Sequence, residues 1–143
     1  MKYEEWLEIL KELKQSSDIE KIEKLKKEPI NSNINDLLQP KIESLIIERF
    51  RNSVNKIINQ LDNILSDPNI LDLSLISFKK EIILTKELAN LKQLSSESKN
   101  ELNDMLKDET NKVFDILIKE SHNIDYTGST ERIINNSRIN WSE

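Results

Sequence analysis

The chain contains one glycine, Gly128, in 143 residues, and this scarcity limits the backbone shapes that it can adopt. Two-residue hairpin turns and phosphate-binding loops depend on glycine, because glycine alone adopts positive φ angles without a steric penalty. Alanine is equally scarce, with only Ala89, while hydrophobic residues make up 36% and charged residues 33% of the chain. This profile is typical of a helical bundle, so we expect an all-α protein.

Two short N-terminal helices are predicted from apolar residues at helical spacing. In residues 3–15, Trp6, Leu10 and Leu13 fall on one face, with glutamates opposite. Residues 17–28 carry a second stripe that stops before Pro29. Residues 30–39 have few charges and many Asn and Ser residues, so they are predicted to be a connector.

Three longer helices are predicted after this connector. The first runs from Pro40 to about Ser66, because apolar residues follow at spacings of 3, 4, 3, 4 and 3 at Ile47, Phe50, Val54, Ile57, Leu61 and Ile64. Its asparagines lie on the opposite side, which we expect to face water. Residues 72–94 form the second, whose apolar residues fall on two sides, as in a helix packed between neighbours or one that touches a partner. Residues 97–121 form the third.

The last segment, residues 122–143, is predicted to be a tail that folds onto the bundle. Phe114 and Ile118 lie off the core stripe of the 97–121 helix and need cover, while Gly128 permits a turn and residues 131–136 suit one or two helical turns. We therefore expect one domain over 1–143, with short helices in 1–28, the main bundle in 40–121 and the tail in 122–143. The predicted architecture is an antiparallel bundle of three long helices, one or two short N-terminal helices and a C-terminal tail strapped to the bundle.

Charge and composition restrict the partners. The net charge is −5 and the isoelectric point is about 5.1, which argues against nucleic acid and anionic lipid and fits a basic protein partner. The basic residues that could contact nucleic acid are surrounded by acids: Arg49, Arg51, Lys79 and Lys80. No apolar run approaches the ~20 residues of a membrane span, and no secretion signal is evident, so we expect a cytoplasmic protein and no membrane partner. The abundance of Lys, Asn and Ile indicates an AT-rich genome.

Catalytic chemistry has few candidates. His122 is the one histidine, it sits at the predicted end of a helix, and the chain has no cysteine. The chain lacks the Glu and His spacing of a di-iron bundle. We therefore predict no catalytic residues, no metal site, no cofactor and no enzymatic activity.

Carboxylates are concentrated on one side of the 97–121 helix. At 100° per residue, five of them fall within about 60° of one another; we call this set the acidic ridge, and it comprises Glu97, Glu101, Asp104, Asp108 and Asp115. Residues 95–121 hold four Lys against seven Asp and Glu, a net charge of −3. The ridge fits a surface that docks a basic protein, although a solvated face tempered by lysines and a carboxylate-bound Mg²⁺ remain open alternatives.

The tail carries a second candidate binding set. Arg138, Ile139 and Trp141 are residue types that dominate interface energetics. They either fold back over Phe114 and Ile118 or reach a partner in trans, and the sequence leaves both outcomes open.

Together these features indicate a non-enzymatic module that binds another protein. The most concrete hypothesis is a small acidic inhibitor or immunity-type protein that masks a basic partner. An adaptor or a subunit of a larger complex fits nearly as well, and a carboxylate-metal or nucleic-acid-processing protein fits less well. Whether the second apolar side of the 72–94 helix forms a homodimer interface stays open.

Overall fold

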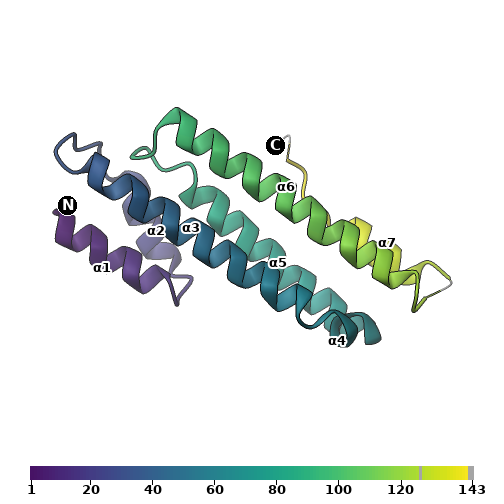
Figure 1. The fold of residues 1–143 in the computed structure, drawn as a ribbon. Helices are drawn as coiled ribbons and strands as arrows, with labels where there is room; N and C mark the ends of the chain where they lie inside the picture. The colour runs from purple at the N-terminus through teal and green to yellow at the C-terminus, as the bar shows by residue number, and fades with distance from the viewer. Residues whose placement is uncertain (126, 142–143) are drawn as a thin grey trace.

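The fold is taken from a computed structural model that describes residues 1–125 and 127–141; Tyr126, Ser142 and Glu143 of the predicted tail lie outside the described residues. Within the described residues the chain forms seven helices and no strand, which confirms the all-α prediction. They are α1 (Tyr3–Leu13), α2 (Ile19–Lys27), α3 (Asn35–Ile58), α4 (Leu61–Ser66), α5 (Pro68–Leu88), α6 (Ser96–Ser121) and α7 (Ser129–Asn136). Figure 1 shows α3, α5 and α6 as the long helices, with α1 alongside α3.

The two N-terminal helices form much as the sequence indicates. Trp6, Leu10 and Leu13 of α1 are buried and α1 packs against α3. The N-cap of α2 is Asp18, whose carboxylate accepts hydrogen bonds from the backbone N–H groups of Glu20 at 3.0 Å and Lys21 at 3.3 Å. An aspartate at this position satisfies N–H groups that the first turn leaves free and complements the positive end of the helix.

The predicted start of the long helix at Pro40 is wrong, because α3 begins at Asn35 and Pro40 lies inside it. Proline lacks the N–H group that would donate to the carbonyl four residues earlier, so it normally marks a helix start. The preceding turn nevertheless forms: Leu38 is fully buried and its N–H donates to the carbonyl of Ile34 at 2.9 Å. Burial of Leu38 in the core outweighs the loss of one hydrogen bond at Pro40.

The long helix predicted for 40–66 is divided in two. The backbone leaves helical geometry at Gln60, with φ −125° and ψ 22°, and α4 begins at the next residue. Ile57 and Ile64 are nevertheless both buried on either side of this break. The apolar spacing therefore identified the buried face correctly but could not show that the helix is interrupted at Gln60.

The helix predicted for 72–94 is α5, which starts four residues earlier at Pro68 and ends at Leu88. Pro68 occupies the first helical position and Asp67 is the N-cap, accepting from the N–H of Asn69 at 2.8 Å. Its two apolar sides have different environments. The core side, with Leu75, Phe78 and Ile82, is buried, as are Leu91 and Leu94 in the connection that follows, whereas Ile76 and Ile83 are exposed.

One apolar core is shared by all seven helices of the described chain. Phe78 of α5 and Phe114 of α6 meet in it, with ring centroids 6.2 Å apart. α7 lies along α6 (Figure 1) and also contacts α5, and its Ile134 is fully buried. The core thus holds α6 in a fixed orientation, with one face inward and the opposite face in solvent.

Candidate functional site

The acidic ridge is positioned by the way in which α6 forms. Ser95 caps the helix, its hydroxyl accepting from the N–H of Ser98 at 3.1 Å. The inward face is apolar and buried, with Leu102, Leu106, Val113 and Leu117. The ridge residues lie on the other side, and all five are exposed: Glu97, Glu101, Asp104, Asp108 and Asp115.

Most of the ridge carboxylates form no ion pair within the described chain. Among the described residues, no ion pair or hydrogen bond joins a cation to Glu97, Glu101, Asp104 or Asp108. Lys112 pairs instead with Glu109, at 3.2 Å, outside the ridge. Like charges at i,i+4 repel by a few tenths of a kcal/mol per pair. The first half of α6 therefore carries four exposed carboxylates that form no ion pair within the described chain.

Asp115, at the far end of the ridge, is neutralised by the tail. Its carboxylate Oδ1 accepts from Arg138 Nη2 at 2.9 Å, and the two side chains are 71% and 33% exposed, respectively. The guanidinium of Arg138 also lies 5.5 Å from the centre of the Phe114 ring. The structure therefore brings the two sequence-predicted sets together at one point and separates Asp115 from the unpaired part of the ridge.

Ile139 and Trp141 lie against the bundle rather than in free solvent. Both are half-buried and pack against the core, and Lys86 Nζ of α5 stands 4.9 Å from the Trp141 ring centre. Phe114, which needed cover, is 1% exposed. Arg138 thus contacts α6, Trp141 contacts α5 and Ile139 packs against the core, while a role for the three residues in partner binding stays a prediction.

Asp125 organises the start of the tail, a role that sequence inspection missed. Its carboxylate accepts from Thr127 Oγ1 at 2.6 Å and Thr127 N at 2.9 Å, and from Thr130 N at 2.7 Å and Thr130 Oγ1 at 2.9 Å. The hydroxyl of Thr127, followed by the other three donors, lowers the pKa of Asp125 well below its usual range. The available signal was an aspartate followed by threonines two and five residues later, with Gly128 at φ 79° between them.

Arg49, which the sequence suggested as a possible nucleic-acid contact, has a structural role in the fold. It is 8% exposed and donates to both carboxylate oxygens of Glu81, each at 2.7 Å. It also donates to the carbonyl of Leu13, to the carbonyl of Ser16 at 2.8 Å and to Ser17 Oγ at 3.0 Å. Arg49 therefore ties the α1–α2 connection to α3 and α5 and is not available to a phosphate.

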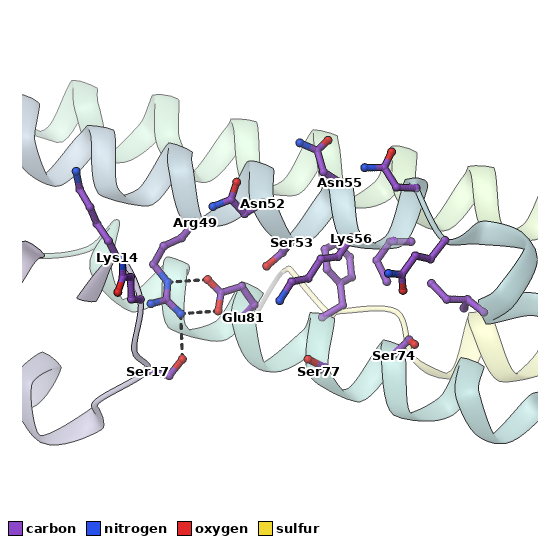
Figure 2. Close-up of a pocket in the computed structure, with 16 residues that line it drawn as sticks. Lys14, Ser17, Arg49, Asn52, Ser53, Asn55, Lys56, Ser74, Ser77 and Glu81 are labelled. Atoms are coloured by element: carbon purple, nitrogen blue, oxygen red, sulfur yellow. Dashed lines mark hydrogen bonds and ion pairs between the residues drawn. The ribbon is translucent and has the colours of Figure 1, made fainter. Parts of the chain in front are cut away.

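A groove of about 750 Å³ opens beside this ion pair, between α3 and α5. Figure 2 shows Arg49 hydrogen-bonded to Glu81, with Asn52 and Asn55 of α3 and Ser74 and Ser77 of α5 among the other residues that line the groove. Its apolar floor is Ile57, Ile64 and Phe78, and its polar rim includes Asn52, Asn55, Asn59, Ser74 and Ser77. The asparagines were correctly expected to meet water, but their spacing gave no sign of a groove.

His122 and the acidic side chains were the candidates for catalytic or metal chemistry. His122 Nε2 lies 3.1 Å from Glu131 Oε2, on an exposed surface, and no serine or threonine hydroxyl within the described ranges is hydrogen-bonded to it. Across residues 1–125 and 127–141, no group of three or more His, Cys, Asp and Glu side chains is arranged to hold a metal ion. In the same residues, no helix has the length and apolarity to cross a membrane.

Comparison with family models, with curated proteins and with solved structures found no match to this chain.

Proposed function

We propose that this protein is a non-enzymatic, protein-binding helical module whose acidic ridge on α6 docks a basic surface of another protein. The observation that carries the proposal is the set of four exposed carboxylates that lack a cation partner within the described chain. In this proposal α3, α5 and α6 form an antiparallel three-helix bundle that is strapped by the tail. The bundle holds these carboxylates in fixed relative positions. Preorganised charges need little reordering on binding.

The most concrete form of this function is an inhibitor or immunity-type protein that masks a basic cleft. The negative field over the first half of α6 accelerates the approach of a basic partner. Lysine and arginine side chains of the partner then pair with Glu101, Asp104 and Asp108. An acidic helix lying across a basic active site blocks it by occupying the space and by neutralising the charges that bind its substrate.

Paired charge reversals test the ridge. Asp104→Lys with Asp108→Lys reverses two ridge charges, whereas Glu4→Lys with Glu8→Lys reverses two exposed acids of α1 at the same i,i+4 spacing. Both variants raise the net charge from −5 by the same amount. In co-purification from cells of the native host, we expect the ridge variant to lose a partner that wild type and the α1 variant retain. Equal recovery by both variants would exclude the ridge.

A metal titration separates this proposal from a carboxylate-metal function. A site that binds Mg²⁺ or Mn²⁺ raises the melting temperature as the ion concentration rises, by mass action. We expect a flat response to both ions. A saturable rise that Asp104→Asn with Asp108→Asn removes would favour metal chemistry instead.

A further inference from the structure

The outward face of α5 carries large apolar side chains that no other part of the described chain covers. Leu73 is 67% exposed, Ile83 48% and Ile76 45%. These three residues belong to a line of six positions along the helix, three apolar and three polar, at successive spacings of 4, 3, 4, 3 and 4 residues. We call this line the α5 seam; it comprises Asn69, Leu73, Ile76, Lys80, Ile83 and Glu87. This is the spacing by which two helices pack knobs into holes.

The two ends of the seam differ in shape. At the C-terminal end, Ile83 is one of the residues that line a hollow of about 470 Å³, together with Lys26, Lys86, Asn90 and Lys92. At the N-terminal end, Leu73 is the most exposed of the apolar residues of α5. One end of the seam therefore offers a protruding side chain and the other offers a concavity.

The two ends also differ in charge. Residues 57–78 include the N-terminal half of the seam. They contain three aspartates, Asp62, Asp67 and Asp72, and no lysine or arginine. The hollow at the other end is lined by three lysines and one glutamate. An acidic end with a knob and a basic end with a hollow are complementary when one copy of the helix is reversed against another.

We propose that the α5 seam is a homodimer interface in which two copies of this chain pair antiparallel about a two-fold axis. In this register each Leu73 enters the hollow beside the partner's Ile83, Ile76 packs on the stem of the partner's Lys80, and Asn69 faces the partner's Glu87. Asp72 approaches the basic wall of the hollow, next to the partner's Lys86. A two-fold axis makes every contact twice, which doubles the effect of each complementary pair. The interface does not use the acidic ridge of α6.

Sedimentation equilibrium of the full chain over a concentration series tests the association. We expect the wild-type mass to rise from the 16.8 kDa of one chain toward twice that value. Leu73→Glu should raise the dimer dissociation constant at least about tenfold, as loss of an interface anchor does. Leu37→Glu, at an exposed leucine of α3, should leave it unchanged and serves as the control. A wild type that stays monomeric up to about 1 mM, the weak limit of specific association, would overturn the proposal and leave the seam to a different partner.

Cysteine cross-linking tests the register, because the natural chain has no cysteine to interfere. A mixture of Leu73→Cys and Ile83→Cys proteins should form mixed disulfide dimers faster than either protein alone forms its own. Circular dichroism of each variant verifies that it remains folded. Preferential linkage of Leu73→Cys to itself would overturn the proposed register, since Leu73 faces its own copy only in a parallel pair or in an antiparallel pair centred on Leu73.

Discussion

Two arginines attach the two ends of the chain to the bundle, and they do so in contrasting ways. Arg49 is 8% exposed and uses both ends of its guanidinium on Glu81, on two backbone carbonyls and on Ser17. Arg138 is 33% exposed and pairs with an Asp115 side chain that is 71% exposed. The same pair of chemical groups is therefore largely buried in one place and a surface contact in the other.

The difference teaches that burial, and not the presence of an ion pair, determines how strongly the fold depends on it. A largely buried charge that loses its partner is poorly hydrated, so removing one member costs several kcal/mol. An exposed pair exchanges one set of hydrogen bonds for another with water, so it contributes little. Removing one member of the Arg49 pair should accordingly lower the free energy of unfolding by a large amount, and removing one member of the Arg138 pair should lower it only slightly.

The largest expected effect is that of Glu81→Ala, which leaves the Arg49 guanidinium without its carboxylate. We expect the free energy of unfolding to fall by about 3–5 kcal/mol, the range for breaking a buried pair. Urea denaturation measures it. Arg51→Ala, at an exposed neighbouring arginine, is the control and should change stability by less than about 0.5 kcal/mol. A loss below about 1 kcal/mol for Glu81→Ala would show that the pair behaves like a surface contact.

A smaller loss is expected when the chain is truncated after Asn136. This removes Arg138 and the half-buried Ile139 and Trp141, and with them apolar burial of about 1–3 kcal/mol. Thermal unfolding and urea denaturation measure the effect. Unchanged stability together with loss of a binding partner would show that these residues act in trans and not on their own bundle.

The Arg138–Asp115 pair by itself should contribute still less. A double-mutant cycle with Arg138→Ala and Asp115→Ala is expected to give a coupling energy of about 0.2–1 kcal/mol, which salt diminishes. The cycle cancels the separate contact of Arg138 with Phe114. A coupling energy as large as that of the Arg49 pair would remove the contrast between the two ends.

The smallest effect concerns pH and Asp125. Because four donors favour its carboxylate and lower its pKa, its contribution to stability is complete above the ordinary aspartate pKa of about 4 and is lost as pH falls through the lowered folded value. Asp125→Asn retains the shape but not the charge. We expect wild type to exceed this variant in stability at neutral pH, with the difference shrinking in acid. A difference independent of pH would contradict this role.

The comparison also shows where sequence reasoning succeeds. Helical periodicity correctly placed Trp6, Leu13, Ile57, Ile64 and Leu117 in the core, because burial of one face is a repeating local property. It failed at Pro40, which lies inside α3 because the turn before it packs Leu38 into the core. It also failed at Gln60, where the helix is interrupted. Local helix propensity and tertiary packing both contribute to the free energy of a backbone conformation, but a short stretch of sequence reveals only the local propensity.

The features of the candidate site also differ in whether they could be predicted from local sequence. The exposure of the acidic ridge was predictable, since five acids at helical spacing on one side of an amphipathic helix face away from its core. The clamp around Arg49 was not, because its partners lie 32 to 36 residues away and no local pattern links Leu13 or Glu81 to it. The pairing of Asp115 with Arg138 was hidden for the same reason, with 23 residues between them.

The central claim is that the unpaired carboxylates of the ridge form the docking surface. The most direct measurement is the affinity of the isolated partner, by calorimetry at low and high salt, for wild type, Asp104→Lys/Asp108→Lys and Glu4→Lys/Glu8→Lys. We predict that the ridge variant binds at least about tenfold more weakly, with a smaller dependence on salt, and that the α1 variant matches wild type. Equal affinities for the two variants would contradict the claim.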